Sequence, residues 1–138
     1  MKLHELDIRG CDKQGCGHFG ASRGTRKHNG IDLVCLTGDD IQSPVNGIVT
    51  KIGYPYGAED KLHIRYVQVT CGDYDFRVFY IKPMVEVGQL VNTNSVLGFA
   101  QELGCFYPGI TEHVHLEIKD KNGCYVDPTP TIEVMRCL

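Results

Sequence analysis

His28-Asn29-Gly30-Ile31-Asp32 and, much later in the chain, His113-Val114-His115 are the two segments from which the fold and chemistry can be predicted. Two imidazoles and one carboxylate can hold Zn²⁺ and leave a fourth position open for water. Residues i and i+2 of a strand point to the same face, so His113 could stand beside a metal bound by His115 and handle a proton. Each spacing alone is weaker evidence than paired Cys-x-x-Cys. The two together, each beside strand-like sequence, favour a zinc site.

Composition places the chain among small globular proteins. Its 138 residues suit one domain with a real core. A net charge of −3 and the lack of a basic stripe make nucleic acid an unexpected partner. No apolar run approaches the ~20 residues of a membrane span. With 16 glycines and few helix-like periods, the sequence favours β-structure rich in turns.

Seven cysteines in so short a chain favour an oxidising compartment with disulfides. The segment Cys11 to Cys16 encloses a small loop and predicts a local disulfide; a metal-binding pair is the weaker alternative. An odd count leaves at least one thiol unpaired. Met1-Lys2-Leu3-His4-Glu5 lacks the apolar region of a signal peptide. Either a leader has been removed or the protein is not secreted, and the cysteines favour a secreted, extracellular protein.

The pattern of short apolar runs and turn residues predicts one compact, mostly β, antiparallel domain. Asn46-Gly47 between two apolar runs predicts a hairpin. Further strands are expected at 31–36, 62–70, 76–81 and 112–119. The expected organisation is an N-terminal arm at 1–27 with the Cys11–Cys16 loop, a domain at 28–130 and a C-terminal tail at 131–138.

Other polar residues near the histidine segments have two interpretations each. Arg23, Arg26 and Lys27 precede His28 and are expected to form a solvated loop, with an anion-binding rim as the alternative. Glu117 shares a strand face with both histidines of the second segment. It could accept an N–H from a ligand imidazole and fix its tautomer, or it could face solvent. The remaining histidines are given no metal role: His4, His18 and His63.

The chain resembles the lysostaphin-type zinc endopeptidases, which are compact β-proteins that cut peptide cross-bridges in bacterial cell walls. The matching segments occur in the same order over about residues 28–130. They are His28-x-Gly30-x-Asp32, Ser43 to Val49, Val87 to Val91 with Val96-Leu97-Gly98, His113 to Glu117, and Val126-Asp127-Pro128.

This resemblance implies a cofactor and site residues. The Zn²⁺ ligands would be His28, Asp32 and His115, and His113 would match a catalytic histidine. The peptidases use a second catalytic histidine on the strand before the glycine-punctuated segment, and here the matching place is assigned to Lys82. An ammonium group cannot act as a base while charged, so efficient catalysis is not expected.

A narrower resemblance, over about residues 9–130, is to the leukocyte cell-derived chemotaxin 2 family. It is carried by Cys11 to Gly17, Phe79-Tyr80-Ile81-Lys82-Pro83, and Tyr107-Pro108-Gly109-Ile110 with His113-Val114-His115. That family consists of secreted animal proteins on the zinc-peptidase fold, regarded as signalling factors. The resemblance implies a disulfide between Cys71 and Cys124 and a Tyr107 loop that could reach over the groove. In that family the cysteine matching Cys35 pairs with one upstream, but residues 1–10 here contain no cysteine. Cys35 is therefore expected to pair with Cys137 or Cys105, which leaves the other one free.

Three functions follow in order of preference. The first is a secreted zinc-binding signalling or innate-immune recognition protein that binds a cell-surface receptor, a microbial surface or peptidoglycan. The second is an active zinc endopeptidase that cleaves glycine-rich cross-bridges with His113 as its catalytic base. The third, a disulfide-rich β-module without metal, is the least favoured because the motifs are ordered.

Overall fold

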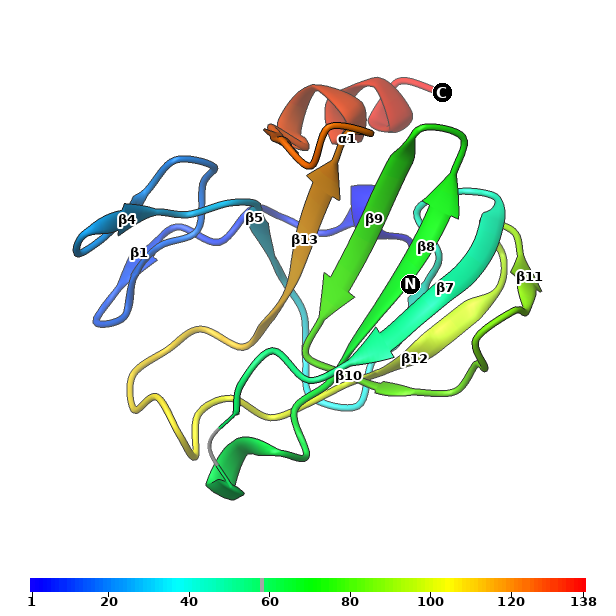
Figure 1. Ribbon diagram of the computed structural model, residues 1–138. Coiled ribbons are helices and arrows are strands. Elements are labelled where there is room, and N and C mark those ends of the chain that lie inside the picture. Colours follow the sequence, from blue (N-terminus) through cyan, green and yellow to red (C-terminus); the bar gives the residue numbers. More distant parts are fainter. Residues whose placement is uncertain (58) are drawn as a thin grey trace.

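The computed structural model describes residues 1–57 and 59–138 (Figure 1), and it confirms a mostly β domain. The largest sheet has seven strands in the order β11-β7-β8-β9-β13-β14, with β5 also paired to β13, and a second sheet has the order β10-β12-β6. Two small hairpins, β1-β2 and β3-β4, precede them. The strands are β1 (Cys11–Asp12), β2 (Gly15–Cys16), β3 (Ser22–Arg23), β4 (Arg26–Lys27), β5 (Ile31–Val34), β6 (Asp40–Gln42), β7 (Gly47–Gly53), β8 (Tyr66–Cys71), β9 (Tyr74–Phe79), β10 (Ile81–Pro83), β11 (Leu90–Val91), β12 (Val96–Ala100), β13 (His113–Lys119) and β14 (Tyr125–Val126). The helices are the 3-10 turns η1 (Leu3–Glu5) and η2 (Glu59–Lys61) and the α-helix α1 (Thr129–Arg136).

Strand β13 carries the second histidine segment through the centre of the large sheet. It pairs with β9 along one edge and with β5 and then β14 along the other. All of its residues except the last are buried, although three of the buried residues are polar or charged. A polar side chain that is buried needs a hydrogen-bond partner, so this strand is where a functional site is expected.

The apolar core lies between the two sheets. Fully buried side chains from the small sheet, including Ile41 and Leu97, form one cluster with Val67, Val78 and Leu116 of the large sheet. The central strands β5, β8 and β13 are buried along most of their length, so the side chains on both faces of these strands are covered.

Both ends of the chain join this core. Leu3 and Leu6 belong to the buried cluster, and Ile8 forms a β-bridge with Leu33. Most of residues 131–138, expected as a tail, lies in α1, whose Ile132 is buried against the core and which contacts η1. In Figure 1, α1 lies across one end of the large sheet.

The prediction of a hairpin at Asn46-Gly47 is wrong. Strand β6 pairs with β12, whereas β7 pairs with β8 and β11. Gly47 begins β7, and a Cβ at this position would overlap the carbonyl oxygen of Thr70. The glycine therefore serves a close approach between two strands rather than a turn.

The strand predicted at 76–81 is divided by Tyr80. This residue has a φ of 72°, and the chain there leaves β9 and enters β10 of the other sheet. A bulky residue with positive φ is uncommon, and its conformation cannot be read from an apolar pattern. The strand predicted at 62–70 begins only at Tyr66, because the turn η2 precedes it.

The disulfide between Cys11 and Cys16 is confirmed. The Cys71–Cys124 bridge is not formed, since β9 and β13 lie between the strands that carry or follow these cysteines. Cys35 is also unpaired, so the expected bridges to Cys105 or Cys137 are wrong: Cys35 lies in the core, and the two candidate partners are exposed. Burial raises the pKa of the Cys35 thiol to about 12, which makes it unreactive at neutral pH.

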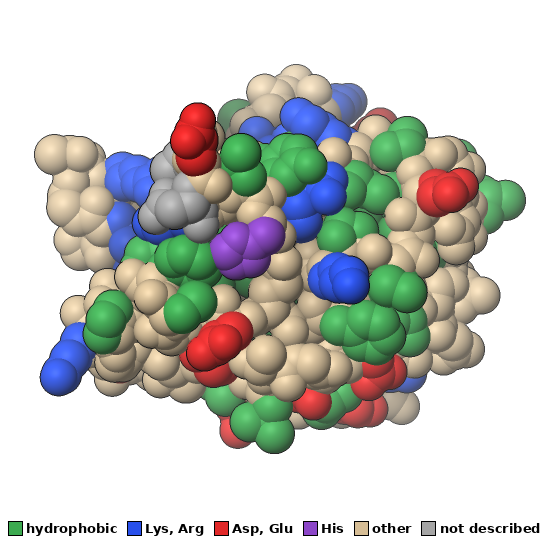
Figure 2. All heavy atoms as spheres, turned by 90° about the horizontal axis from the view of Figure 1, so that it is seen from below, with side chains coloured by type: hydrophobic (Ala, Val, Ile, Leu, Met, Phe, Trp, Pro, Cys, Tyr) green, Lys and Arg blue, Asp and Glu red, His purple; other side chains and the backbone are tan. Residues whose placement is uncertain are grey.

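The surface of the described chain is mixed in character. Figure 2 shows one face, on which hydrophobic side chains are interspersed with basic and acidic ones. Within the described residues, no helix has the length and apolar character needed to cross a membrane.

Candidate metal centre

The pairing of β5 with β13 brings the two histidine segments together. Asp32 of β5 lies directly opposite His115 of β13 in the register, and His28 precedes β5. The Oδ1 atom of Asp32 is 2.9 Å from Nδ1 of His115 and 3.1 Å from Nε2 of His28. The two ring nitrogens are 3.0 Å apart. The three predicted ligands thus lie in one buried cluster that could hold a metal ion.

Glycine at position 30 permits this convergence. A Cβ on Gly30 would overlap the carbonyl oxygen of Leu116 and lie 3.0 Å from Cε1 of His115. The start of β5 therefore approaches β13 more closely than any larger residue allows.

Hydrogen bonds at the outer edge of the cluster set the histidine tautomers. Nδ1 of His28 is 3.0 Å from the carbonyl oxygen of His18, which can only accept, so this nitrogen carries the proton. Nε2 of His115 is 3.0 Å from a carboxylate oxygen of Glu117 and donates to it in the same way. In each neutral ring, the nitrogen that faces Asp32 therefore presents a lone pair. Glu117 holds the tautomer of His115, as one of its two sequence interpretations proposed.

The donor set fits a zinc ion. Two imidazole lone pairs and a carboxylate oxygen about 3 Å apart repel one another unless a cation lies among them. Tetrahedral Zn²⁺ with bonds of about 2.0–2.1 Å would place its ligand atoms about 3.3 Å apart, close to the observed spacing. The residues that would hold the ion are His28, Asp32 and His115.

Asp32 is itself fixed by cations on its other side. Its Oδ2 atom accepts a hydrogen bond of 3.1 Å from Nε of Arg9 and lies 3.7 Å from a guanidinium nitrogen of Arg23. Burial by itself would raise the pKa of Asp32, but the His115 and His28 side chains beside its carboxylate outweigh burial and hold this pKa far below its usual range. The carboxylate therefore stays ionised and presents Oδ1 to the cluster.

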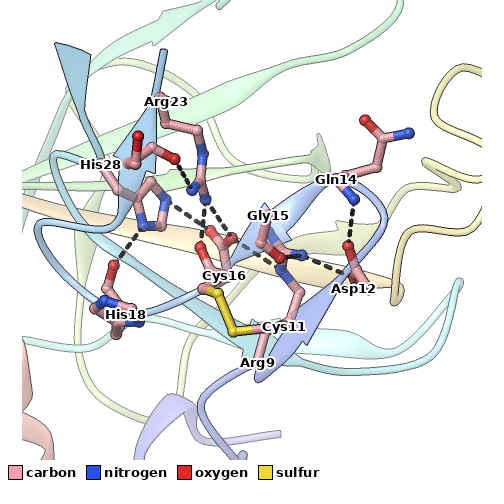
Figure 3. The surroundings of a disulfide bond; sticks show 11 residues. Arg9, Cys11, Asp12, Gln14, Gly15, Cys16, His18, Arg23 and His28 are labelled. Atoms are coloured by element: carbon pink, nitrogen blue, oxygen red, sulfur yellow. Dashed lines mark hydrogen bonds and ion pairs between the residues drawn. A yellow bond between two sulfur atoms is a disulfide. The ribbon is translucent and has the colours of Figure 1, made fainter. Parts of the chain in front are cut away.

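The small disulfide loop supports Arg9 (Figure 3). Arg9 is only 3% exposed. Its guanidinium group also donates to Oδ2 of Asp12 at 2.8 Å and to the carbonyl oxygen of Gly15 at 3.0 Å. Asp12 in turn accepts a hydrogen bond from the backbone N–H of Thr111, just before β13. The loop, the arginine and the ligand strand form one connected network.

His113 stands beside the predicted ligands without joining them. Its Nδ1 donates to the carbonyl oxygen of Thr111 at 2.7 Å, which leaves Nε2 unprotonated and 3.4 Å from Oδ2 of Asp32. Burial lowers the pKa of His113, and the nearby Asp32 carboxylate only partly offsets it. A neutral imidazole in this place can accept a proton.

Lys82 does not lie at the site, which corrects the assignment made from the sequence. It is an exposed residue of β10, opposite Phe99, and it is not among the residues that line the cavity. Tyr80 lies there instead, with its ring centroid 5.5 Å from that of His113 and 6.4 Å from that of His115. Because Tyr80 has a positive φ, the direction of its side chain does not follow the alternation expected along a regular strand.

A cavity of about 380 Å³ opens above the cluster. One wall is aromatic: Tyr56 and Tyr107 line it together with Tyr80, and the hydroxyl of Tyr56 is 3.2 Å from that of Tyr80. Nζ of Lys61 donates to the Tyr107 hydroxyl at 3.2 Å and lies 5.2 Å from the Tyr56 ring centroid. The Tyr107 loop thus contributes to the wall of the site.

Comparisons with known proteins show the family of the chain. A family model described as "Domain of unknown function (DUF8155) N-terminal domain" matches residues 22–128. Leukocyte cell-derived chemotaxin-2 of Bos taurus is 32% identical over 123 residues, covering 89% of this chain and 78% of the relative. The chain belongs to the leukocyte cell-derived chemotaxin-2 family.

Solved structures show the fold that this chemotaxin-like chain shares. The antimicrobial peptidase lysostaphin from Staphylococcus simulans superposes with a TM-score of 0.70 at 17% identity, covering 96% of this chain and 52% of that one. A zinc-containing peptidase from Vibrio cholerae superposes with a TM-score of 0.63 at 22% identity, covering 88% of this chain and 36% of that one. The predicted lysostaphin-type fold is confirmed.

Two residues of this chemotaxin-like site were missed by the sequence reasoning. Arg9 lies outside every recognised motif, and its contact with Asp32 depends on the fold. Tyr80 was within a quoted segment, but its positive φ leaves no trace in an alternating pattern. The only available signal was its place in the segment Phe79-Tyr80-Ile81-Lys82-Pro83, which carries the narrower resemblance.

The affinity of the site for Zn²⁺ is expected to fall as pH is lowered. Burial lowers the pKa of His115, but hydrogen bonds with Asp32 and Glu117 outweigh it and raise the pKa above 6.5. Nδ1 of His115 must lose its proton to bind a metal. Because the pKa is raised, protons compete with Zn²⁺ for this nitrogen at a higher pH than they would at an ordinary histidine. Chelator competition between about pH 8 and pH 6 should show up to about a tenfold loss per unit. A pH-independent affinity would contradict this.

Proposed function

We propose that this chain is a secreted zinc-binding recognition protein of the chemotaxin type, which uses a peptidase fold to bind rather than to cut. His28, Asp32 and His115 hold the ion, and zinc stabilises the fold because it binds only the folded state. The partners are a cell-surface receptor or a microbial surface that includes peptidoglycan. The Cys11–Cys16 disulfide and the family of the chain support an extracellular location.

The observation that carries this proposal is the residue beside His113. A zinc-dependent hydrolase gains a polarised carbonyl and an acidic bound water from its ion, and it needs neighbouring groups to move protons. Tyr80 stands near His113 where a second base would be needed. Burial raises the pKa of Tyr80 well above 10, and its hydroxyl faces that of Tyr56. A neutral phenol can donate a hydrogen bond but cannot accept the proton of water at neutral pH.

His113 is the feature that favours the alternative, an active zinc endopeptidase. It is neutral, oriented by Thr111 and adjacent to Asp32. General acid–base catalysis contributes about 10²–10⁴ to a rate, so His113 alone would leave only weak turnover.

We expect zinc-loaded protein to leave glycine-rich peptides and purified peptidoglycan uncleaved. Product release is followed by mass spectrometry, with lysostaphin as the positive control and the metal-free chain as the blank. The reason is that, among the described cavity residues, His113 and Glu117 are the proton-accepting side chains beside the predicted ligands, and Glu117 is already engaged by His115. Cleavage that requires zinc and disappears in His113→Ala would overturn the recognition proposal and establish the alternative.

A further inference from the structure

The three basic residues before His28 form one edge of the cavity. Arg23, Arg26 and Lys27 lie on the hairpin β3-β4, and all three line the same cavity as the predicted ligands. Arg23 is held in place by hydrogen bonds to the carbonyl oxygens of Ser22 and Cys16. Arg26 and Lys27 are exposed, and no carboxylate among the side chains that the structure describes forms an ion pair with either. They are therefore available to a ligand.

The arrangement of this hairpin costs stability in the free protein. Arg23 and Arg26 are directly opposite each other in the β3-β4 register. Like charges in that relation repel, by an amount comparable to what opposite charges would contribute. A bound anion between the two strands and the cavity would relieve the repulsion.

The acidic groups of the cavity do not neutralise Arg26 or Lys27. Asp32 already contacts Arg9, Arg23 and three histidines, and Glu117 is engaged by His115. A divalent ion held by the predicted ligands would add further positive charge. The space available to a ligand is therefore lined by basic side chains and by the aromatic side chains of Tyr56 and Tyr107.

We propose that this cavity binds an organic oxyanion, a carboxylate or a phosphate, whose charge is held by Arg26 and Lys27. The body of the ligand, no larger than about one or two amino-acid residues, lies against the tyrosine wall, as the volume of about 380 Å³ allows. The inference deepens the proposed function by naming the ligand class of the same site. Its basic edge, however, is built from residues that do not hold the metal.

Isothermal titration calorimetry tests the proposal on zinc-loaded protein of measured metal content. The probes are N-acetyl-glycyl-tyrosine, its C-terminal amide and phenyl phosphate; the first and third share an aromatic body and differ in the oxyanion. The test variant is Arg26→Gln with Lys27→Gln, which removes the repulsion in the hairpin and should fold. The matched control is Lys82→Gln with Lys121→Gln, two exposed residues that do not line the cavity.

We expect the free acid or the phosphate to bind about tenfold or more tightly than the amide, as a charged hydrogen bond allows. The test variant should lose about tenfold affinity for the anion, and the control variant should lose none. A tighter phosphate would identify a phosphate ester as the ligand, and a tighter carboxylate would identify a peptide terminus. The anion should also raise the Tm of the wild type more than that of the test variant.

Two results would overturn the inference: equal binding of acid, phosphate and amide, or equal anion binding by the test and control variants. If anions bind through zinc alone, the second result appears while the metal content is normal, so the inference fails and the proposed function stands. If the chain retains no zinc, the proposed function fails, and anion binding that depends on Arg26 and Lys27 can still be measured on the metal-free protein.

Discussion

Replacing Gly30 with alanine is expected to destabilise the metal-free protein by about 3 kcal/mol or more, because overpacking against backbone has no cheap relief. The added methyl would overlap the carbonyl oxygen of Leu116 and crowd the His115 ring. Strand β5 must then move away from β13, and the register that places Asp32 opposite His115 is lost. Zinc affinity should fall by at least about 10–100-fold, the loss seen when ligand orientation is disturbed.

Gly10→Ala is the matched control for this substitution. No atom lies within 4 Å of a Cβ built on Gly10, and its φ is not in the left-handed region. Alanine there should be neutral or should stabilise by up to about 1 kcal/mol, by restricting the unfolded chain. Urea unfolding and a zinc competition titration measure both variants. If Gly30→Ala behaved like Gly10→Ala, the close approach of β5 to β13 would not be what forms the site.

Replacing Arg9 with methionine is expected to cost the metal-free protein about 3–5 kcal/mol, the penalty for removing one partner of a buried ion pair. Methionine keeps the length of the side chain, but it leaves Asp32 and Asp12 without their shared donor. Zinc affinity should fall by about 10–100-fold, since the carboxylate loses the contact that orients it. Added zinc should recover part of the lost stability, because binding to the folded state is linked to unfolding.

Arg9→Lys separates the role of charge from the role of geometry. A lysine ammonium is a point charge and cannot bond two carboxylates through a planar fork. The lysine variant should therefore lie between the wild type and Arg9→Met in both stability and zinc affinity. Equal zinc affinity in all three proteins would show that Arg9 only fills space.

The long-range pairing at the site could be predicted from two short motifs, but its supporting residues could not. His28, Asp32, His113 and His115 are chemically distinctive, and strand periodicity placed the last two on one face. Arg9 is an ordinary arginine until the chain folds it onto Asp32. A contact of this kind depends on the packing of distant segments and leaves no local pattern.

Local backbone geometry explains the remaining errors. Asn46-Gly47 has the composition of a hairpin turn, but Gly47 is required for close packing against Thr70. Tyr80 adopts a positive φ that its residue type disfavours. Because this conformation interrupts the alternation of side chains, counting residues along the predicted strand did not show which side chain faces the site. Lys82 was therefore assigned to a place that Tyr80 occupies.

The metal content of the purified chain, measured by mass spectrometry alongside X-ray absorption at the zinc edge, is the most direct test of the central claim. We expect one zinc per chain in a four-coordinate nitrogen and oxygen environment, and loss of that zinc in His115→Ala. A folded wild-type chain that neither retains zinc nor takes it up at micromolar concentration would contradict the account.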